Sequence, residues 1–218
     1  MAPLLVLGAT GRIGIALRQV WGPDAAIWQA RAPRAGFVAW DILADPAPAG
    51  VASGVVLLLA GGRSAAGQDA ALARATLRAA QAQGARWVFL ASSAAVYGPG
   101  EGLAESASAA PVSAYGEAKR AMEMAAHDVR GVPVTLLRIG NVVGADGLIG
   151  AAMPGQPVLL DRAEGRPRGP VRSWIGPATL ATVLAGLGTR APRVEGGPPR
   201  ANPPPPRLTD ELRGPLAG

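Results

Sequence analysis

A tyrosine and a lysine four residues apart are the residues of this sequence best suited to acid–base chemistry. Tyr115 and Lys119 fall in a segment with helical character, so both side chains are expected on one helix face. A tyrosine hydroxyl has an ordinary pKa of about 10, and a neighbouring ammonium group lowers that pKa. Lys119 is the single lysine of the chain, beside twenty arginines, and Tyr115 is one of two tyrosines. A chance pair on a helix surface is the alternative.

A serine hydroxyl that hydrogen-bonds a substrate oxygen would complete such a site. Ser92 and Ser93 end an apolar, strand-like segment upstream of the pair. Serine, tyrosine and lysine together can move a proton while hydride passes between an alcohol or carbonyl carbon and a nicotinamide. The residues therefore predict an oxidoreductase with a nicotinamide cofactor.

A glycine-rich turn near the start of the chain can hold that cofactor. It follows an apolar strand and opens a helix, the context that gives a glycine pattern its meaning. Glycines let the chain turn sharply, admit a pyrophosphate to the backbone and present helix N–H groups to it. A flexible loop without a ligand is the alternative. The residues expected at the cofactor are Gly8, Thr10, Gly11, Arg12, Ile13 and Gly14.

The choice between NAD and NADP depends on the end of the second strand. An NAD site usually places an acid there for the ribose 2′-hydroxyl, whereas an NADP site has arginine for the 2′-phosphate. Here the segment carries Arg31 and Arg34 and no acid, and Arg12 is a third candidate. NADP is favoured over NAD, although these can be ordinary surface arginines. Asp41 is placed to bind the adenine amino group, or is a turn aspartate.

Alternating strand-like and helical segments over the first 140 residues predict a parallel sheet with crossover helices. Later signals are weaker, with a strand at 158–160 and a helix over 177–187. The expected strands are 4–7, 26–30, 37–40, 55–60, 86–91 and 134–138, and the expected helices 12–21, 68–83 and 114–129.

Composition limits the other classes of function. The 218 residues are 49% apolar and 17% charged, which fits one domain with a buried sheet. The net charge of +6 comes from scattered arginines, so a nucleic-acid partner is not expected. No segment predicts a signal peptide or a membrane span, and a cytoplasmic protein is expected. The chain has no cysteine and no ligand cluster for a metal, and His127 is expected at the surface or at a helix C-cap.

The tail from 190 to 218 differs from the rest of the chain. It holds eight of the twenty-one prolines and little apolar periodicity, so an extended or disordered segment is expected. The abrupt shift in composition also suggests a change of reading frame. Residues 1–189 are then the nucleotide-binding domain, with small substrate-covering elements after about 140.

Four segments together resemble the short-chain dehydrogenase/reductase superfamily, above all its extended branch, the NAD-dependent epimerase/dehydratase family. The resemblance covers roughly residues 4–188 and implies an α/β fold of the Rossmann type, with a doubly wound parallel sheet and a reduced C-terminal substrate lobe. A later segment, 173–181, resembles the one that returns a late helix to the nucleotide domain. The four segments are 8–14, 88–98, 115–119 and 137–144.

The resemblance also implies roles for single residues. Ser93 would be the catalytic serine with Ser92 beside it at the substrate, Tyr115 the acid/base, and Lys119 the group that lowers the tyrosine pKa and holds the nicotinamide ribose. Asn141 would contact a substrate diphosphate, or be a turn asparagine. The remaining expected cofactor contacts are Tyr115 itself and, directly after the central strand, Ala60 and Gly61.

Departures from the family pattern bear on the reaction. Ala94 and Ala95 stand where sugar dehydratases carry an Asp-Glu pair, so elimination is not expected. A short substrate lobe favours a small carbonyl, alcohol or sugar derivative over a nucleotide-sugar. A nucleotide-sugar epimerase and a non-catalytic NADP-binding regulatory protein remain alternatives. By analogy, a homodimer through the Tyr115 helix is possible.

Overall fold

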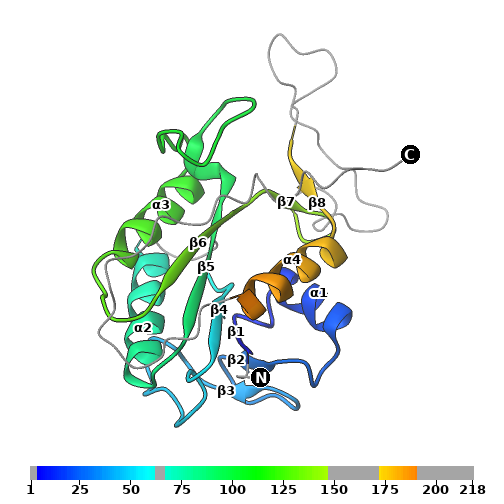
Figure 1. Ribbon diagram of the computed structural model, residues 1–218, viewed down its shortest axis with the longest axis vertical. Helices are drawn as coiled ribbons and strands as arrows, with labels where there is room; N and C mark the ends of the chain where they lie inside the picture. Colours follow the sequence, from blue (N-terminus) through cyan, green and yellow to red (C-terminus); the bar gives the residue numbers. More distant parts are fainter. Residues whose placement is uncertain (1–3, 62–66, 147–171, 191–218) are drawn as a thin grey trace.

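The computed structural model describes residues 4–61, 67–146 and 172–190 (Figure 1). Its centre is one sheet of six parallel strands in the order β3-β2-β1-β4-β5-β6. The chain therefore fills one half of the sheet outward from β1 and then returns to start the other half at β4. The strands are β1 (Leu4–Leu7), β2 (Ile27–Ala30), β3 (Val38–Ala39), β4 (Val55–Leu58), β5 (Trp87–Ser93) and β6 (Val134–Ile139).

Helices cover both faces of the sheet, as Figure 1 shows. On one face lie α1 (Arg12–Trp21) and α4 (Pro177–Arg190), and on the other α2 (Gln68–Ala82) and α3 (Ala114–Ala126). The expected α/β fold of the Rossmann type, with a doubly wound parallel sheet, is confirmed. This strand order places the ligand crevice of such folds at the carboxyl ends of β1 and β4.

The unbroken apolar run of β4 is explained by burial on both of its faces. Val56 and Leu58 belong to the core under α2 and α3, whereas Val55 and Leu57 belong to the core under α1 and α4. Side chains alternate across a strand, so a strand covered on both faces must be apolar at every position. Leu77 of α2 is among the fully buried residues of the first core.

Three short elements complete the described residues. The 3-10 helix η1 (Ala94–Tyr97) follows β5 directly, and β7 (Asn141–Val142) pairs in parallel with β8 (Trp174–Ile175). This pairing brings the chain back to the sheet just before α4. The strand expected at 158–160 and the proline-rich tail beyond 190 lie outside the described residues.

Element boundaries differ from expectation mainly at α3 and β3. Helix α3 ends at Ala126, three residues early, because His127 is its exposed C-cap and donates its N–H to the Met124 carbonyl. Strand β3 is only two residues long and pairs with the last two residues of β2, Gln29 and Ala30. None of the helices in the three described ranges is long and apolar enough to cross a membrane.

Candidate functional site

The expected site residues gather at the carboxyl edge of the sheet. Gly8 directly follows β1, Ala60 and Gly61 follow β4, and Ser93 ends β5. A Cβ added to Gly8 would lie 2.6 Å from the Ala60 nitrogen, so the loops after β1 and β4 touch. The contact joins the two halves of the sheet at the place where folds of this type bind their ligand.

The glycine turn has the shape that a dinucleotide pyrophosphate requires. Gly8 has a φ of +76°, in the left-handed region, and its N–H donates to the Gln29 side chain of β2. A Cβ at Gly14 would lie 2.5 Å from the Ala9 Cα, so α1 begins directly against the turn. Gly11 caps α1 without a side-chain hydrogen bond, and the first turn contains no acid. The first N–H groups of α1 are therefore available to an anion, and the residues present fit the cofactor.

The polar residues around the turn make contacts within the protein. The Arg12 Nη1 donates to the Asp146 carbonyl at 2.5 Å and so bridges the turn to the chain after β7. The Arg31 side chain is 75% exposed, with its Nε 4.0 Å from the Asp41 carboxylate. Asp41 also accepts the Leu43 N–H, as a turn aspartate does. Of the arginines expected at a 2′-phosphate, Arg31 and Arg34 are both exposed, and the Arg34 guanidinium lies over the Phe37 ring, 5.2 Å from its centre.

The glycine after Tyr115 lets the start of α3 pack closely against η1. Ser113 caps α3 by accepting the Gly116 N–H at 3.1 Å. A Cβ at Gly116 would lie 2.6 Å from the Ala95 carbonyl oxygen in η1, so the start of α3 packs against the backbone two residues after Ser93. Tyr115 is 43% exposed there.

The hydroxyl of Ser93 is oriented by η1. Its oxygen accepts the Ala95 N–H at 3.2 Å, as a cap of the 3-10 helix. Since the oxygen serves as the acceptor of that bond, the hydroxyl hydrogen remains able to donate to a bound oxygen. Ser93 is half-buried at the end of β5.

Lys119 forms a buried ion pair that the sequence analysis did not anticipate. Its Nζ lies 3.1 Å from the Asp69 Oδ2, and the two side chains are only 4% and 3% exposed. Asp69 belongs to the first turn of α2, where the helix dipole also favours a carboxylate. The same Nζ lies 5.9 Å from the centre of the Tyr115 ring. Lysine and tyrosine thus share one helix side, as their spacing predicts.

The carboxylate of Asp69 also reaches the sheet edge. A Cβ at Gly61 would lie 2.6 Å from the Asp69 Oδ1, so this acid is packed under the loop after β4. Asp69 is therefore a site residue that the sequence analysis missed. The available signal was an acid in the first turn of the helix that follows the central strand.

A second buried network lies behind the serines. The Ser92 hydroxyl donates to the Glu123 carboxylate, which also accepts two hydrogen bonds from the Arg138 guanidinium at 2.9 and 2.7 Å. These bonds raise the pKa of Arg138 above its ordinary value, against the opposing effect of burial. Arg138 also lies 4.6 Å from the centre of the Tyr97 ring. The Ser92 hydroxyl is thus bonded to the buried Glu123, and its expected contact with substrate stays a prediction.

The remaining expected residues are dispersed around the edge. Thr10 is exposed in the turn, and Ile13 packs on the core under α1 and α4. The Asn141 side-chain amide donates to the Ser173 carbonyl at 3.2 Å, so it ties β7 to the residue before β8. No group of three His, Cys, Asp or Glu side chains in the described ranges is placed to hold a metal ion.

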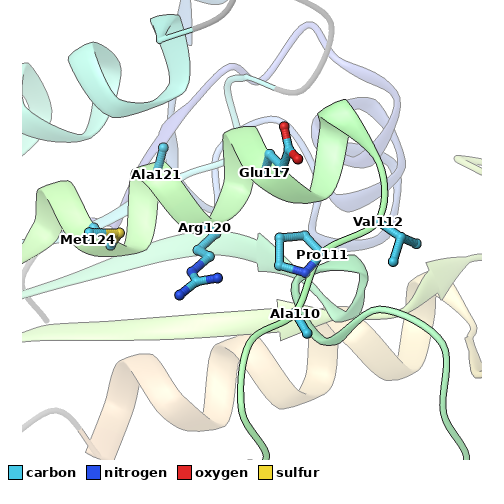
Figure 2. Close-up of a pocket in the computed structure, with 7 residues that line it drawn as sticks. All are labelled: Ala110, Pro111, Val112, Glu117, Arg120, Ala121 and Met124. Atoms are coloured by element: carbon cyan, nitrogen blue, oxygen red, sulfur yellow. The ribbon is translucent and has the colours of Figure 1, made fainter.

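A groove of about 500 Å³ lies on the outer side of α3 and is separate from this site. Figure 2 shows the Arg120 side chain pointing from α3 toward the segment of Ala110, whereas the Glu117 carboxylate points to the other side of the helix. Lys119 is buried and its pair with Asp69 faces α2. The chemistry-bearing side chains thus lie on the inner side of the helix.

One family model matches the central part of the chain. The model of the NAD dependent epimerase/dehydratase family matches residues 49–155. This range contains the loop after β4, both serines, Tyr115 and Lys119. No curated protein matches the chain.

Solved structures share the fold at low sequence identity. MoeE5, in complex with UDP-glucose and NAD, is 22% identical with a TM-score of 0.69, over 88% of this chain and 73% of that one. TunA, an NAD-dependent NDP-hexosamine 5,6-dehydratase, is 19% identical with a TM-score of 0.66, over 87% and 73%. The UDP-N-acetylglucosamine 4-epimerase from Bacillus cereus is 15% identical with a TM-score of 0.64, over 88% and 76%.

Proposed function

Because residues 49–155 of this chain belong to the NAD-dependent epimerase/dehydratase family, we propose that the protein is an NAD(P)-dependent oxidoreductase. It transfers hydride at a carbonyl or alcohol carbon, with Tyr115 as the acid/base. The observation that supports the proposal is the close packing of Gly116, next to Tyr115, on Ala95, two residues after Ser93. This packing lies at the sheet edge that also bears the glycine turn.

The glycine turn and the loop after β4 would hold the cofactor. Gly8, Gly11 and Gly14 admit the pyrophosphate to the first N–H groups of α1, and Ala60 and Gly61 flank it. When bound, NAD(P) supplies or accepts the hydride. The remaining chemistry falls to the side chains of the chain itself.

Ser93, Tyr115 and Lys119 divide that chemistry among them. The Ser93 hydroxyl donates to the substrate oxygen, while its own oxygen is fixed by the Ala95 N–H. The Tyr115 hydroxyl gives a proton to that oxygen during reduction and takes it back during oxidation. Lys119 lies beside the tyrosine, with its Nζ 5.9 Å from the centre of the Tyr115 ring, and its ion pair with Asp69 holds it in place.

We propose NADP as the preferred cofactor. The exposed Arg31, close to Asp41, carries the proposal because its guanidinium is open to a 2′-phosphate. Binding of NADPH and NADH to the wild type and to Arg31→Ala tests it. We expect NADPH to bind more tightly than NADH to the wild type, and the variant to lose that difference. Equal affinity of the wild type for both would refute the preference.

A nucleotide-sugar epimerase is the second candidate, because the family match and the fold shared with UDP-sugar-binding proteins both favour it. In that reaction the substrate is first oxidised and then reduced on its other face, with no net use of cofactor. The same serine, tyrosine and lysine would serve both steps.

One set of measurements separates these functions. Purified full chain is titrated with NADPH and NADH, and then incubated with UDP-glucose, UDP-N-acetylglucosamine and a small aldehyde. Net consumption of NADPH supports the oxidoreductase, and interconversion of a UDP-sugar without net consumption supports the epimerase. Binding without turnover of any of these probes supports a regulatory protein.

Tyr115→Phe provides the mechanistic test. It removes only the hydroxyl, so we expect turnover to fall by at least about a hundredfold while cofactor binding is kept. Turnover retained in this variant would refute the role of the tyrosine.

A further inference from the structure

A buried glutamine connects the glycine turn to the far edge of the sheet. Gln29 lies in β2 and is 3% exposed. Its side-chain Oε1 accepts the Gly8 N–H at 2.8 Å, and its Nε2 donates to the Trp40 carbonyl at 2.5 Å. Gly8 follows β1 and Trp40 follows β3, so one amide links the carboxyl ends of three neighbouring strands.

The two contacts use both the acceptor and the donor of the side-chain amide. The Gly8 N–H and the Trp40 carbonyl both belong to chain leaving the sheet, beyond the ladder hydrogen bonds of β1 and β3. Buried backbone groups need a partner. A carboxylate would lose the donor to Trp40, and an apolar side chain would lose both bonds. Among side chains of this length, glutamine alone satisfies the two groups together.

The two hydrogen bonds of Gln29 are called the clamp below. Their position relates the clamp to cofactor binding rather than to the core alone. Gly8 has its backbone against Ala60 and opens the turn beneath the expected pyrophosphate. Trp40 precedes Asp41, whose carboxylate lies 4.0 Å from the Arg31 Nε. The amide therefore sets the glycine turn at a fixed place relative to the Arg31–Asp41 pair, which lies at the adenosine end of the proposed site.

We propose that Gln29 is a positioning residue for the dinucleotide: it fixes the glycine turn before the cofactor binds. The inference rests on the proposed cofactor site. If the turn is already fixed, the cofactor need not order it, and affinity is higher for that reason. Loss of the clamp should therefore raise the Kd and the KM for the cofactor and leave kcat at saturating cofactor nearly unchanged.

The chain contains a matched control. Gln83, the C-cap of α2, makes the same kind of double contact: its Oε1 accepts the Ala52 N–H at 2.7 Å and its Nε2 donates to the Pro48 carbonyl at 2.8 Å. Gln83 precedes β5, at the opposite edge of the sheet from the glycine turn. Its replacement removes an equivalent clamp without touching the cofactor site.

The experiment compares Gln29→Met with Gln83→Met in the full chain. Unfolding by urea and titration with NADPH and NADH are measured for both variants and for the wild type. We expect both variants to lose stability, and only Gln29→Met to lose cofactor affinity, by about tenfold. With a substrate that the wild type turns over, the KM for cofactor should rise in Gln29→Met while kcat is kept.

The outcomes distinguish this inference from the function on which it rests. Failure of the wild type to bind either cofactor refutes the proposed function itself. Wild-type binding that is unchanged in Gln29→Met, or equally weakened in Gln83→Met, overturns the role of Gln29 alone. Should Gln29→Met not fold, the inference is tested on the wild type alone, and a Gly8 N–H that exchanges rapidly without cofactor would overturn it. Amide exchange gives a check without a variant, since the Gly8 N–H should be protected in the cofactor-free wild type.

Discussion

Replacement of Gly116 by alanine is expected to separate the proposed acid/base from its serine. Gly116 follows Tyr115 in α3, and its backbone faces Ala95, two residues after Ser93. A Cβ at this position would lie 2.6 Å from the Ala95 oxygen and 3.0 Å from the Pro111 Cβ. Ordinary van der Waals contact begins at 3.4 Å, so α3 and η1 must move apart by about 0.8 Å.

The size of the effect follows from this displacement. A misplacement of about 1 Å at a reacting centre costs on the order of a hundredfold in rate, so we expect kcat to fall by tens of times. Overpacking costs about 1–3 kcal/mol. Alanine in a helix gains about 1 kcal/mol over glycine. The free energy of unfolding should therefore fall by only about 0–2 kcal/mol.

The assay measures kcat at saturating cofactor, together with urea unfolding and the Kd for NADPH. Gly186→Ala is the control, because Gly186 lies exposed in α4 with no atom within 4 Å of the added Cβ. This control should keep kcat and gain up to about 1 kcal/mol in stability. A kcat for Gly116→Ala equal to that of the wild type would refute the reasoning, since the contact would then not set Tyr115 against Ser93.

Two further predictions concern the buried charges. Asp69→Asn leaves the buried ammonium of Lys119 without its counter-charge, so the free energy of unfolding in urea should fall by about 3–5 kcal/mol. The double variant with Lys119→Met should recover part of this loss. A single variant as stable as the wild type would contradict the prediction. Glu123→Gln removes the charge opposite Arg138 and should cost about 1–3 kcal/mol by the same measurement. Asp128→Asn, in a surface pair with side chains 42% and 55% exposed, should cost less than about 1 kcal/mol, and similar losses at both sites would show that burial does not set the cost.

Local patterns in the sequence were enough to predict the fold, and the candidate site residues rest on patterns of the same kind. The glycine turn, the serines and the Tyr115–Lys119 pair are each contained in a few consecutive residues. The apolar run of β4 and the strand–helix alternation predict the parallel sheet. These signals depend on neighbours along the chain, which a sequence displays directly.

The partners of those residues could not be predicted in the same way. Asp69 and Lys119 are fifty residues apart in the sequence, and Gln29 and Gly8 are twenty-one residues apart, on neighbouring strands. In the sequence, Asp69 looks like an ordinary acid in the first turn of a helix. Gln29 looks like an ordinary polar residue near the end of a strand. Their contacts arise only when α2 packs on α3 and when β2 pairs with β1. Which buried polar groups meet is a property of packing.

The packing of α4 on α1 has a consequence for how this chain folds. The Trp21 indole donates to the Ala181 carbonyl across 160 residues, and Leu17 shares its core with Leu180 and Leu184. During synthesis, the side of α1 that faces α4 therefore stays uncovered until α4 has left the ribosome. Contacts of such long sequence separation slow folding, because the chain between them must be ordered first. The half of the sheet around β1, although encoded first, is fully covered only after α4 has been translated.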